Sequence, residues 1–372
     1  MVNYGNVLQR YALQETVKSL GFDVENIKCP IIEFGAFRNG VNFVIKSLKY
    51  AIKLALGVIG VKKYRKKLVE KFSPKSNERN AVDLRNKKRL ELFSDFYSQY
   101  VDNIFDSTYS EALSCDKSRW KKYDYIIAGS DQILNFGIFK TFDALRFYYL
   151  QFAENRQRVS YAPSFGVSRL KFYERHIHKK GLMGFDRFSC REKDGCEIVK
   201  ELTGRNAELV LDPTLLLTAE QWRKISRRPD YDVPEHYAFC YLWHNNDPKL
   251  LKAISEIVGD MNIVWGINPE KDSHASGPCE FLWLIDHADY VITESFHGTV
   301  FAVNFSKKFV SLDPGLHTFS RFSNILEALG LMERVYTFDG KFSDNDIDYE
   351  AVHKKLNAMR EKSMQYLREC LK

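Results

Sequence analysis

The residues whose types and spacing most clearly suggest chemistry lie in a polar segment, 293–299, between two apolar runs. The run 290–292 predicts a buried strand, and the run 300–305 predicts a helix. A strand that leads into a helix through a short polar loop directs unpaired backbone N–H groups at one point, which favours an anion. His297 stands in this loop, where an imidazole can donate hydrogen bonds, carry charge or transfer a proton near neutral pH. A histidine that only satisfies turn carbonyls is an equally good interpretation of this residue alone.

The surrounding sequence predicts the elements that would position this loop. Short strand-like runs alternate with stretches of helical periodicity, and such alternation is typical of a parallel, doubly wound α/β sheet. The predicted strands are part of 24–32, then 124–128, 158–161, 209–211, 237–242, 263–266, 290–292 and 308–312. The predicted helices are 6–20, 170–183, 195–202, 248–258, 279–286, 300–305, 321–329 and 349–371. An aperiodic segment with two prolines, 227–235, indicates a boundary between two α/β units.

Length and composition bound the class of protein. At 372 residues the chain is long enough for two domains of ordinary size, and 45% hydrophobic residues can build real cores. No apolar run is long enough to predict a membrane span, and the first residues lack a signal-peptide pattern. The seven cysteines include no Cys-x-x-Cys pair, so the sequence indicates neither a zinc site nor a disulfide framework. We therefore expect a cytoplasmic protein, since thiols stay reduced there.

The basic charge of the chain is local. The formal net charge is +7, but the segment from Lys46 to Arg89 alone holds 15 Lys or Arg residues and 3 acidic ones. Within it, residues 43–60 predict an amphipathic helix whose polar side carries Lys46, Lys49 and Lys53. Such a helix can lie at an anionic membrane surface, and a core-packed helix with a solvated lysine side explains the same pattern. Aromatic residues are too sparse around it to favour nucleic-acid binding, so nucleic acid is not an expected partner.

Several motifs, taken in their order and spacing, resemble the polysaccharide pyruvyl transferase family along nearly the whole chain. No one of them is specific alone. They are Asn-Tyr-Gly-Asn-Val-Leu-Gln-Arg-Tyr-Ala-Leu at 3–13, Gly-Ser-Asp-Gln at 129–132 with Asn135, Tyr-Ala-Pro-Ser-Phe-Gly at 161–166, Ser-Cys-Arg-Glu at 189–192, Leu-Asp-Pro-Thr at 211–214, Gly-Pro-Cys-Glu-Phe-Leu at 277–282, Ser-Phe-His-Gly-Thr at 295–299 and Ser-Arg-Phe at 320–322.

The resemblance implies an architecture of two Rossmann-like domains that face a cleft, similar to the GT-B glycosyltransferases. We expect an N-terminal domain at 1–226 with a basic helical insertion at about 40–110, a C-terminal domain at 236–345 that carries the Ser-Phe-His-Gly loop, and a C-terminal helix at 346–372. The family normally has a strand before the Asn-Tyr-Gly loop. That first strand of the N-terminal sheet has no counterpart in this sequence.

The resemblance also implies transfer of pyruvate from phosphoenolpyruvate to a sugar as a cyclic ketal, with neither a metal nor a bound cofactor. Arg191 and His297 would be donor-site residues. The chemistry needs such groups, because a guanidinium suits a phosphate or a carboxylate, and because protonation of the methylene carbon and attack by sugar hydroxyls need an acid and a base. The alternative for Arg191 is an ion pair with Glu192 or Asp194. Cys190 is better explained as a buried thiol than as a nucleophile.

This sequence departs from the family at the position of a candidate general acid. Some members carry an Asp-Glu pair where Asn6-Val7 stands, and Asn6 cannot transfer a proton. Asp131 and Glu294 are the candidate replacements because both follow strands at the edge where open α/β sheets bind ligands. Asp131 could instead belong to a turn or helix cap, and Glu294 could lie in solvent. The remaining candidate substrate-binding residues are Asn3, Gly5, Asn6, Ser130, Gln132, Ser295, Gly298, Thr299 and Arg321.

Three functions follow from these patterns. The first is pyruvylation of a bacterial surface polysaccharide or of its lipid-linked precursor, carried out in the cytoplasm or at the inner face of the cell membrane. The second is a GT-B-type glycosyltransferase that uses a nucleotide sugar, since a fold alone does not decide function. The third is a catalytically silent relative that binds glycan or membrane. Because Arg191 and His297 are predicted on loops, we expect their truncation to cost only about half a kcal/mol of stability.

Overall fold

The structure is a computed structural model, and it describes residues 3–28, 76–102, 104–115, 117–242, 248–266, 274–313, 319–337 and 345–372. The predicted basic helix at 43–60 lies outside the described residues, as does most of the predicted insertion. The membrane-binding role of the helix at 43–60 therefore stays a prediction. Among the described residues, no helix is long and apolar enough to cross a bilayer.

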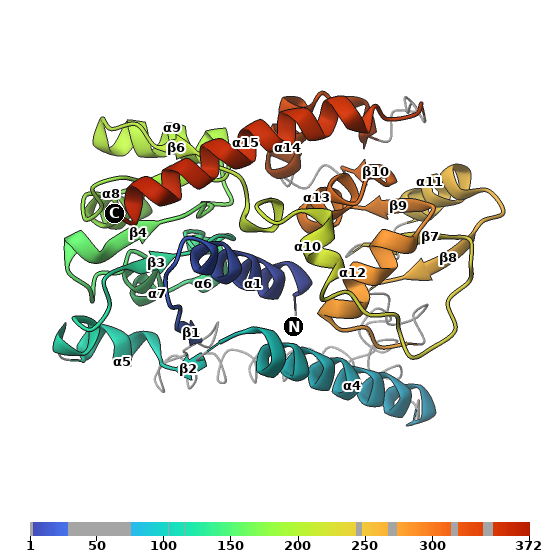
Figure 1. Cartoon of the computed structure of the whole chain (residues 1–372), viewed down its shortest axis with the longest axis horizontal. Helices are drawn as coiled ribbons and strands as arrows, with labels where there is room; N and C mark the ends of the chain where they lie inside the picture. The colour runs from blue at the N-terminus through green and yellow to red at the C-terminus, as the bar shows by residue number, and fades with distance from the viewer. Residues whose placement is uncertain are drawn as a thin grey trace, which may run out of the picture.

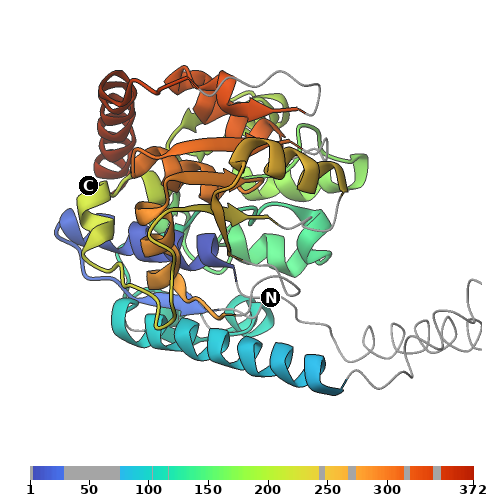
Figure 2. The ribbon, with the colours of Figure 1, turned by 90° about the vertical axis from the view of Figure 1, so that its right-hand side faces the viewer.

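The second half of the chain is built on one parallel sheet of five strands. The strand order is β11-β10-β9-β7-β8, which is a doubly wound order with a switch point between β7 and β9. Thr293 at the end of β9 donates its hydroxyl to the carbonyl of Tyr241 at the end of β7, 2.9 Å away, and so ties the two strands at that point. The strands are β7 (Tyr237–Tyr241), β8 (Asn262–Trp265), β9 (Tyr290–Thr293), β10 (Lys308–Leu312) and β11 (Val335–Tyr336). Figure 2 shows this sheet from the front.

The helices of the second half are α11 (Pro248–Val258), α12 (Pro278–His287), α13 (Phe296–Asn304), α14 (Phe319–Leu329) and α15 (Tyr349–Cys370). One of them differs from the sequence prediction at an important place. Helix α13 begins at Phe296 rather than Val300, so His297 lies in its first helical turn and not in the preceding loop. Ser295 takes the N-cap position, and its carbonyl accepts a hydrogen bond from the N–H of Thr299 at 3.0 Å.

The first half of the chain pairs its short strands two by two, all in parallel. The pairs are β1 (Asn26–Lys28) with β2 (Ile104–Asp106), β3 (Ile126–Ala128) with β4 (Arg158–Ser160), and β5 (Ser189–Cys190) with β6 (Glu208–Leu209). The helices are α1 (Tyr4–Ser19), α4 (Ser76–Tyr100), α5 (Tyr109–Ser114), α6 (Phe136–Phe139), α7 (Phe142–Tyr148), α8 (Arg175–Leu182), α9 (Lys193–Thr203) and α10 (Ala219–Arg223). The α/β class with parallel sheets is thus confirmed, while the division into two Rossmann-like domains stays a prediction.

Helix α1 joins the two halves through an aromatic contact. Its first residue, Tyr4, stacks on Phe281 of α12 with ring centroids 4.4 Å apart, and its hydroxyl donates to the carbonyl of Ser276 at 2.8 Å. The helix begins there because the side chain of Asn3 accepts a hydrogen bond from the N–H of Asn6, which satisfies one of the unpaired donors of the first turn. The largest hydrophobic core accordingly contains side chains from both halves.

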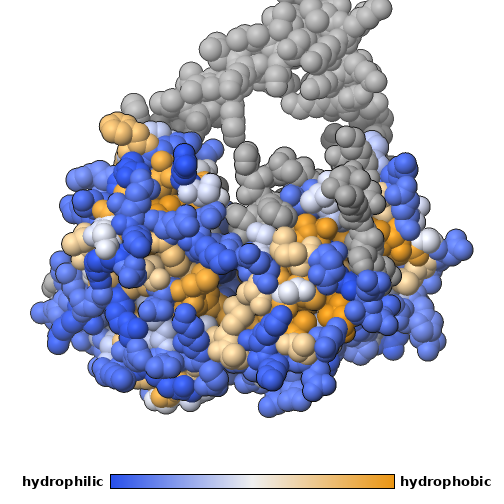
Figure 3. Space-filling view, turned by 90° about the horizontal axis from the view of Figure 1, so that it is seen from above, coloured by the Kyte–Doolittle hydropathy of each residue, from blue (hydrophilic) through white to orange (hydrophobic). Residues whose placement is uncertain are grey.

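Two long helices lie on opposite sides of this core. In Figure 1, α15 crosses both halves along the top and α4 runs along the bottom. The face that carries α15 is mostly hydrophilic, with separate apolar areas between the charged side chains (Figure 3). The two helices therefore lie on either side of the layer that contains α1 and the carboxyl ends of the strands.

Candidate functional site

Asp212 is the centre of a buried polar cluster. It follows β6 and begins a 3₁₀ turn, Pro213–Leu215, in which its Oδ1 accepts from the N–H and the hydroxyl of Thr214 at 3.0 and 2.7 Å. Its Oδ2 accepts from Gln9 Nε2 at 2.9 Å, from Ser130 Oγ at 3.0 Å and from Arg191 Nη1 at 2.9 Å. The carboxylate, whose side chain has no solvent exposure, thus holds together residues from α1, the loop after β3 and the loop after β5.

Arg191 directly follows β5 and points into this cluster. Its Nη1 meets Asp212, its Nε donates to Glu192 Oε1 at 3.0 Å, and its guanidinium lies over the ring of Phe296 at 4.4 Å from the centroid. The ion pair with Glu192, which the sequence left open, is therefore present, and a second one with Asp212 accompanies it. Burial alone would lower the pKa of Arg191, but the carboxylates of Glu192 and Asp212 outweigh burial and raise that pKa above its ordinary value.

His297 reaches the same cluster from the second half of the chain. Its Nε2 lies 2.5 Å from Gln9 Nε2 and 4.0 Å from Asp212 Oδ2. Burial alone would raise the pKa of Asp212, but the charges of Arg191 and His297 lower it below its ordinary value. Arg191 and His297 thus both lie beside Asp212, one from each half of the chain.

The Gln9 amide links the protonation of His297 to Asp212. With Nε2 of Gln9 toward the ring, the amide donates to a neutral imidazole and to Asp212 at once. A protonated ring would instead need the amide oxygen in that place, because Nε2 of the imidazole is then itself a donor. Turning the amide would take its N–H away from Asp212, so the hydrogen bond between Gln9 and Asp212 fits a ring whose Nε2 accepts.

Gly5 makes room for the imidazole. A Cβ placed on Gly5 would lie 2.0 Å from His297 Nδ1, far inside any possible contact. Gly5 belongs to the motif at 3–13, and the close approach of α1 to the first turn of α13 explains why this position needs a glycine.

The two candidate acids sit at different depths. Asp131 has a left-handed backbone, with φ at 75°, and its carbonyl accepts from the N–H of Ile133 at 2.8 Å and from the N–H of Ser164 at 2.9 Å, the second as part of a parallel bridge to Pro163. Its charge also contributes to the raised pKa of Arg191. Glu294, which could have lain in solvent, is instead buried with 7% exposure.

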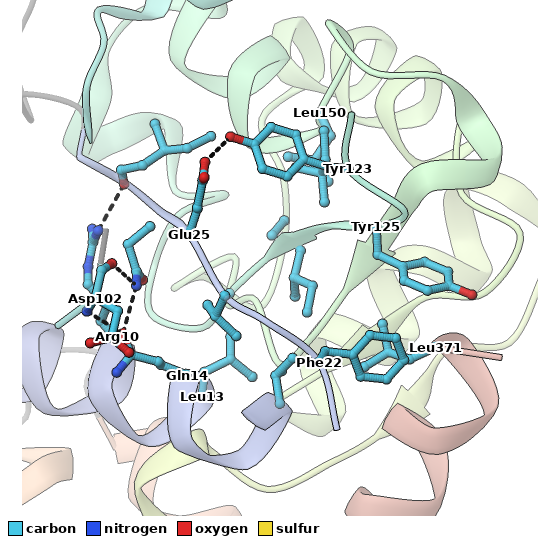
Figure 4. A pocket seen from close by; sticks show the side chains of 18 of the residues that line it. Arg10, Leu13, Gln14, Phe22, Glu25, Asp102, Tyr123, Tyr125, Leu150 and Leu371 are labelled. Carbon is cyan, nitrogen blue, oxygen red and sulfur yellow. Dashed lines mark hydrogen bonds between the residues drawn. The ribbon is translucent and has the colours of Figure 1, made fainter. Parts of the chain in front are cut away.

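Of the remaining predicted residues, some belong to the cluster and others form hydrogen bonds or packing contacts near it. Ser130 belongs to the cluster, while Gln132 accepts a hydrogen bond from Asn135 at 2.8 Å and so braces the loop after β3. Thr299 is fully buried and shares a 2.7 Å hydrogen bond with Ser311, and Gly298 packs against Thr293. The other predicted residues lie on α1 and α14. Asn3 caps α1, as described above, and Asn6 lines the cavity beside α1 (Figure 4). Arg321 lies on α14, where only its backbone is described.

Sequence reasoning missed two members of the cluster, Gln9 and Asp212, as site residues. Asp212 directly follows a predicted strand, and the argument applied to Asp131 would have selected it too. Gln9 sits in the middle of a helix, and nothing in its spacing distinguishes it from any other polar helix residue.

The structure also bears on metal chemistry and on thiol chemistry. Among the described residues, no group of three or more His, Cys, Asp and Glu side chains is arranged to hold a metal ion. Cys190 is fully buried, and burial raises the pKa of its thiol. A buried neutral thiol agrees with the non-nucleophilic interpretation of this cysteine.

Comparisons with known proteins give one match to a family. A family model described as polysaccharide pyruvyl transferase matches residues 3–315. A search of curated proteins gives no match. Among solved structures, one assigned as a UDP-N-acetylglucosamine 2-epimerase from Listeria monocytogenes is similar over 76% of this chain and 80% of that chain, with 12% sequence identity and a TM-score of 0.43. Similarity at that level carries no conclusion about the fold or the function.

Proposed function

The chain belongs to the polysaccharide pyruvyl transferase family and is a transferase, and on that premise we propose that it moves the pyruvyl group of phosphoenolpyruvate to two hydroxyls of a sugar. In the reaction, the methylene carbon takes a proton, one sugar hydroxyl adds to the central carbon, phosphate leaves, and the second hydroxyl closes the ketal. Two hydroxyl protons are released and one is taken up by carbon, so the site must be able to hold and pass a proton.

The observation that carries the proposal is the buried pairing of His297 with Gln9 and Asp212. An imidazole nitrogen that faces an amide N–H and lies 4.0 Å from a carboxylate is placed to take up a proton, and histidine is suited to acid–base work near neutral pH. We assign the proton transfer to His297, with Asp212 stabilising the charged ring. Asp131 and Glu294 remain candidates for a second acid or base.

The first turn of α13 supports an anionic donor. The leading N–H groups of a helix have no partner within it, and the Ser295 side chain makes no capping bond to them. These donors and the positive end of the helix suit the phosphate or the carboxylate of phosphoenolpyruvate. Because Glu192 and Asp212 already engage Arg191, we propose that this arginine positions Asp212 as well as adding positive charge near the donor.

The acceptor and the place of action are part of the same proposal. We propose a polysaccharide or a lipid-linked precursor as the acceptor, with the protein acting at the inner face of the membrane. Support from the sequence for membrane attachment comes from the lysines of residues 43–60. Each lysine near an anionic surface contributes about 1 kcal/mol of binding. Co-sedimentation with anionic vesicles, but not with neutral vesicles, is the expected result.

The experiment that tests the proposed function follows phosphate release from phosphoenolpyruvate in the presence of a panel of sugars and detects pyruvylated products by mass spectrometry. The unmodified protein should release phosphate only when an acceptor is present. His297→Ala and Asp212→Asn should each lower the rate by at least about a hundredfold, the scale of lost general acid–base catalysis. Exposed His236→Ala, whose side chain has 78% exposure, is the matched control.

Ligand stabilisation separates the alternatives before an acceptor is known. Phosphoenolpyruvate at a hundredfold excess over its dissociation constant should raise the free energy of unfolding by about 2.7 kcal/mol. Stabilisation by a nucleotide sugar instead would favour the glycosyltransferase. Stabilisation by neither would favour the catalytically silent relative.

A further inference from the structure

Two segments of the first half of the chain expose an unusual share of apolar side chains. They are residues 136–142, which follow β3, and residues 167–173, which follow β4. Nine large hydrophobic side chains are exposed in the described part of the chain, and these segments hold five of them. Phe172 is the most exposed of the nine, at 90%. We call the five side chains the apolar patch, and its members are Ile138, Phe142, Val167, Phe172 and Tyr173.

The two segments contact one another, so their aromatic side chains belong to one surface. Phe136 stacks on Phe142 with ring centroids 5.0 Å apart, and it meets Tyr173 of the other segment in a T-shaped contact at 6.0 Å. Just before the two segments, the N–H of Leu134 donates to the carbonyl of Ser164 at 3.2 Å. Ring contacts and a backbone hydrogen bond therefore hold the patch together.

The charged residues within the two segments are all basic. Lys140, Arg169 and Lys171 are exposed among the apolar side chains, and neither segment contains Asp or Glu. The ammonium of Lys171 lies 5.8 Å from the centroid of the Tyr173 ring, so a cation borders the patch directly. Glu174, which follows the second segment, is buried and accepts a hydrogen bond from the N–H of Lys171. The surface thus combines apolar side chains with positive charge.

This combination fits an anionic lipid surface. Exposed apolar patches mark sites of interaction, and the charge beside this one selects a negative partner. At a bilayer, lysine and arginine bind the anionic headgroups while apolar and aromatic side chains enter the boundary with the acyl chains. A glycan would instead need hydrogen-bonding side chains beside the rings. Four of the five patch members have no hydrogen-bonding group in the side chain, so the patch favours lipid.

We propose that the apolar patch, with Lys140, Arg169 and Lys171, is a membrane-docking surface that binds a bilayer of anionic phospholipid and inserts Phe172 among the headgroups. This surface is separate from the predicted helix at 43–60. Asp131, which precedes the first segment, bridges to Pro163 before the second, so a docked bilayer would lie on the side toward which β3 and β4 point. Delivery of a lipid-linked acceptor to the polar cluster rests on the proposed function, whereas docking itself does not.

The first test is co-sedimentation of the full chain with vesicles of phosphatidylglycerol and phosphatidylcholine. Phe172→Ala should lower the partition to vesicles by about tenfold, because the transfer of a phenyl group out of water is lost. Lys171→Gln should lower it by about fivefold, because one headgroup contact is lost. Met332→Ala, at an exposed apolar side chain, and Lys252→Gln, at a side chain with 79% exposure, are the matched controls and should change little. Equal binding of all four variants would overturn the proposal.

Insertion provides a second readout, which distinguishes the patch from residues 43–60. On the same vesicles, Phe172→Trp should add fluorescence that shifts to shorter wavelength and is quenched by lipids with brominated acyl chains, relative to the unmodified protein. Met332→Trp, at an exposed position in the second half of the chain, should show neither effect. Both substitutions are at exposed positions, so neither readout depends on repacking of a core.

The remaining outcomes also decide the proposal. Quenching at Phe172→Trp that disappears when Lys46, Lys49 and Lys53 are replaced by glutamine would assign the binding to residues 43–60 and overturn it. A response of Phe172→Trp to a soluble oligosaccharide without lipid would make the patch a glycan site. Self-association that Phe172→Ala abolishes would make it an interface between copies of this chain. Either result would replace the membrane assignment. None of these readouts measures transfer, so the proposed function and the docking surface can fail separately.

Discussion

At the scale of single residues, the polar cluster behaves as one unit around Asp212. Its carboxylate receives three side-chain donors on one oxygen and Thr214 on the other, in a region without solvent. Removal of Arg191 or of Asp212 would leave a buried charge without its opposite partner. The cluster therefore contributes to stability as well as to the proposed chemistry.

Arg191→Ala should lower the free energy of unfolding by about 3–5 kcal/mol, because it leaves two buried carboxylates without their cation. The half kcal/mol expected from a loop position assumed an exposed side chain, whereas the Arg191 side chain is only 3% exposed. Urea unfolding at neutral pH measures the loss. Arg156→Ala, at a side chain with 82% exposure, is the control and should change little. A loss under 1 kcal/mol for Arg191→Ala would show that the ion pairs are solvated.

At the scale of elements, the contact between α1 and α13 sets the position of the imidazole. Gly5→Ala should lower the rate of transfer by at least about tenfold, because the new Cβ must displace His297 from Gln9, and overpacking of this kind costs about 1–3 kcal/mol. The rate with phosphoenolpyruvate measures the effect. Ser19→Ala, at the exposed end of α1, is the control. Unchanged activity of Gly5→Ala would contradict the placement of His297 against α1.

His178 on α8 is buried against Tyr149, the residue that follows α7, and this burial makes the stability of the protein depend on pH. Burial lowers the pKa of His178 from 6.5 to about 4, its Nδ1 shares a 2.7 Å hydrogen bond with the hydroxyl of Tyr149, and its Nε2 has no partner. Because the folded pKa is the lower one, stability is complete above pH 6.5 and falls as the pH drops toward 4. The loss amounts to about 3 kcal/mol over that window.

His178→Gln keeps an acceptor for Tyr149 but cannot take up a proton, so its free energy of unfolding should decline less over the same pH range. Urea unfolding of both proteins at several pH values tests this. His236→Gln, at an exposed histidine, should retain the full decline. An identical decline in the wild-type protein and His178→Gln would assign the pH dependence to other groups.

At the scale of the whole molecule, α15 fastens the two halves together. Arg360 donates to the carbonyl of Leu215 at 2.6 Å and to Asn304 Oδ1 at 2.8 Å, and Tyr366 donates to the carbonyl of Ser160 at 2.9 Å. These bonds join β4 and the turn after Asp212 to the end of α13. The C-terminal helix thus supports both elements that carry the proposed site.

Arg360→Ala should lower the free energy of unfolding by about 2–4 kcal/mol, since it leaves buried acceptors unpaired. A single unfolding transition at lower denaturant would show that the halves unfold together. Arg368→Ala, on the same helix with 51% exposure, is the control. Two separate transitions in Arg360→Ala would instead show that α15 is the main link between them.

The sequence alone determined the class of fold and the identity of most elements. Helix α11 and strand β10 have the predicted boundaries, because their apolar periodicity is strong and their ends carry clear turn residues. The start of α13 was missed by four residues, because Ser295, His297 and Gly298 interrupt the apolar run at the beginning of the helix. The family was also readable from the sequence, because its motifs depend on order and spacing rather than on contacts.

Only the tertiary structure decided which polar residues meet. Gln9, Asp212 and His297 are separated by 203 and 85 positions in the chain, and no local pattern records that they share hydrogen bonds. The burial of Arg191 is likewise a product of packing. Local sequence determines backbone preference and hydrophobic period, whereas contacts between distant segments depend on how whole elements stack. Predictions about elements and about single candidate residues such as Arg191 and His297 could therefore be made from the sequence, whereas their meeting at Asp212 needed the fold.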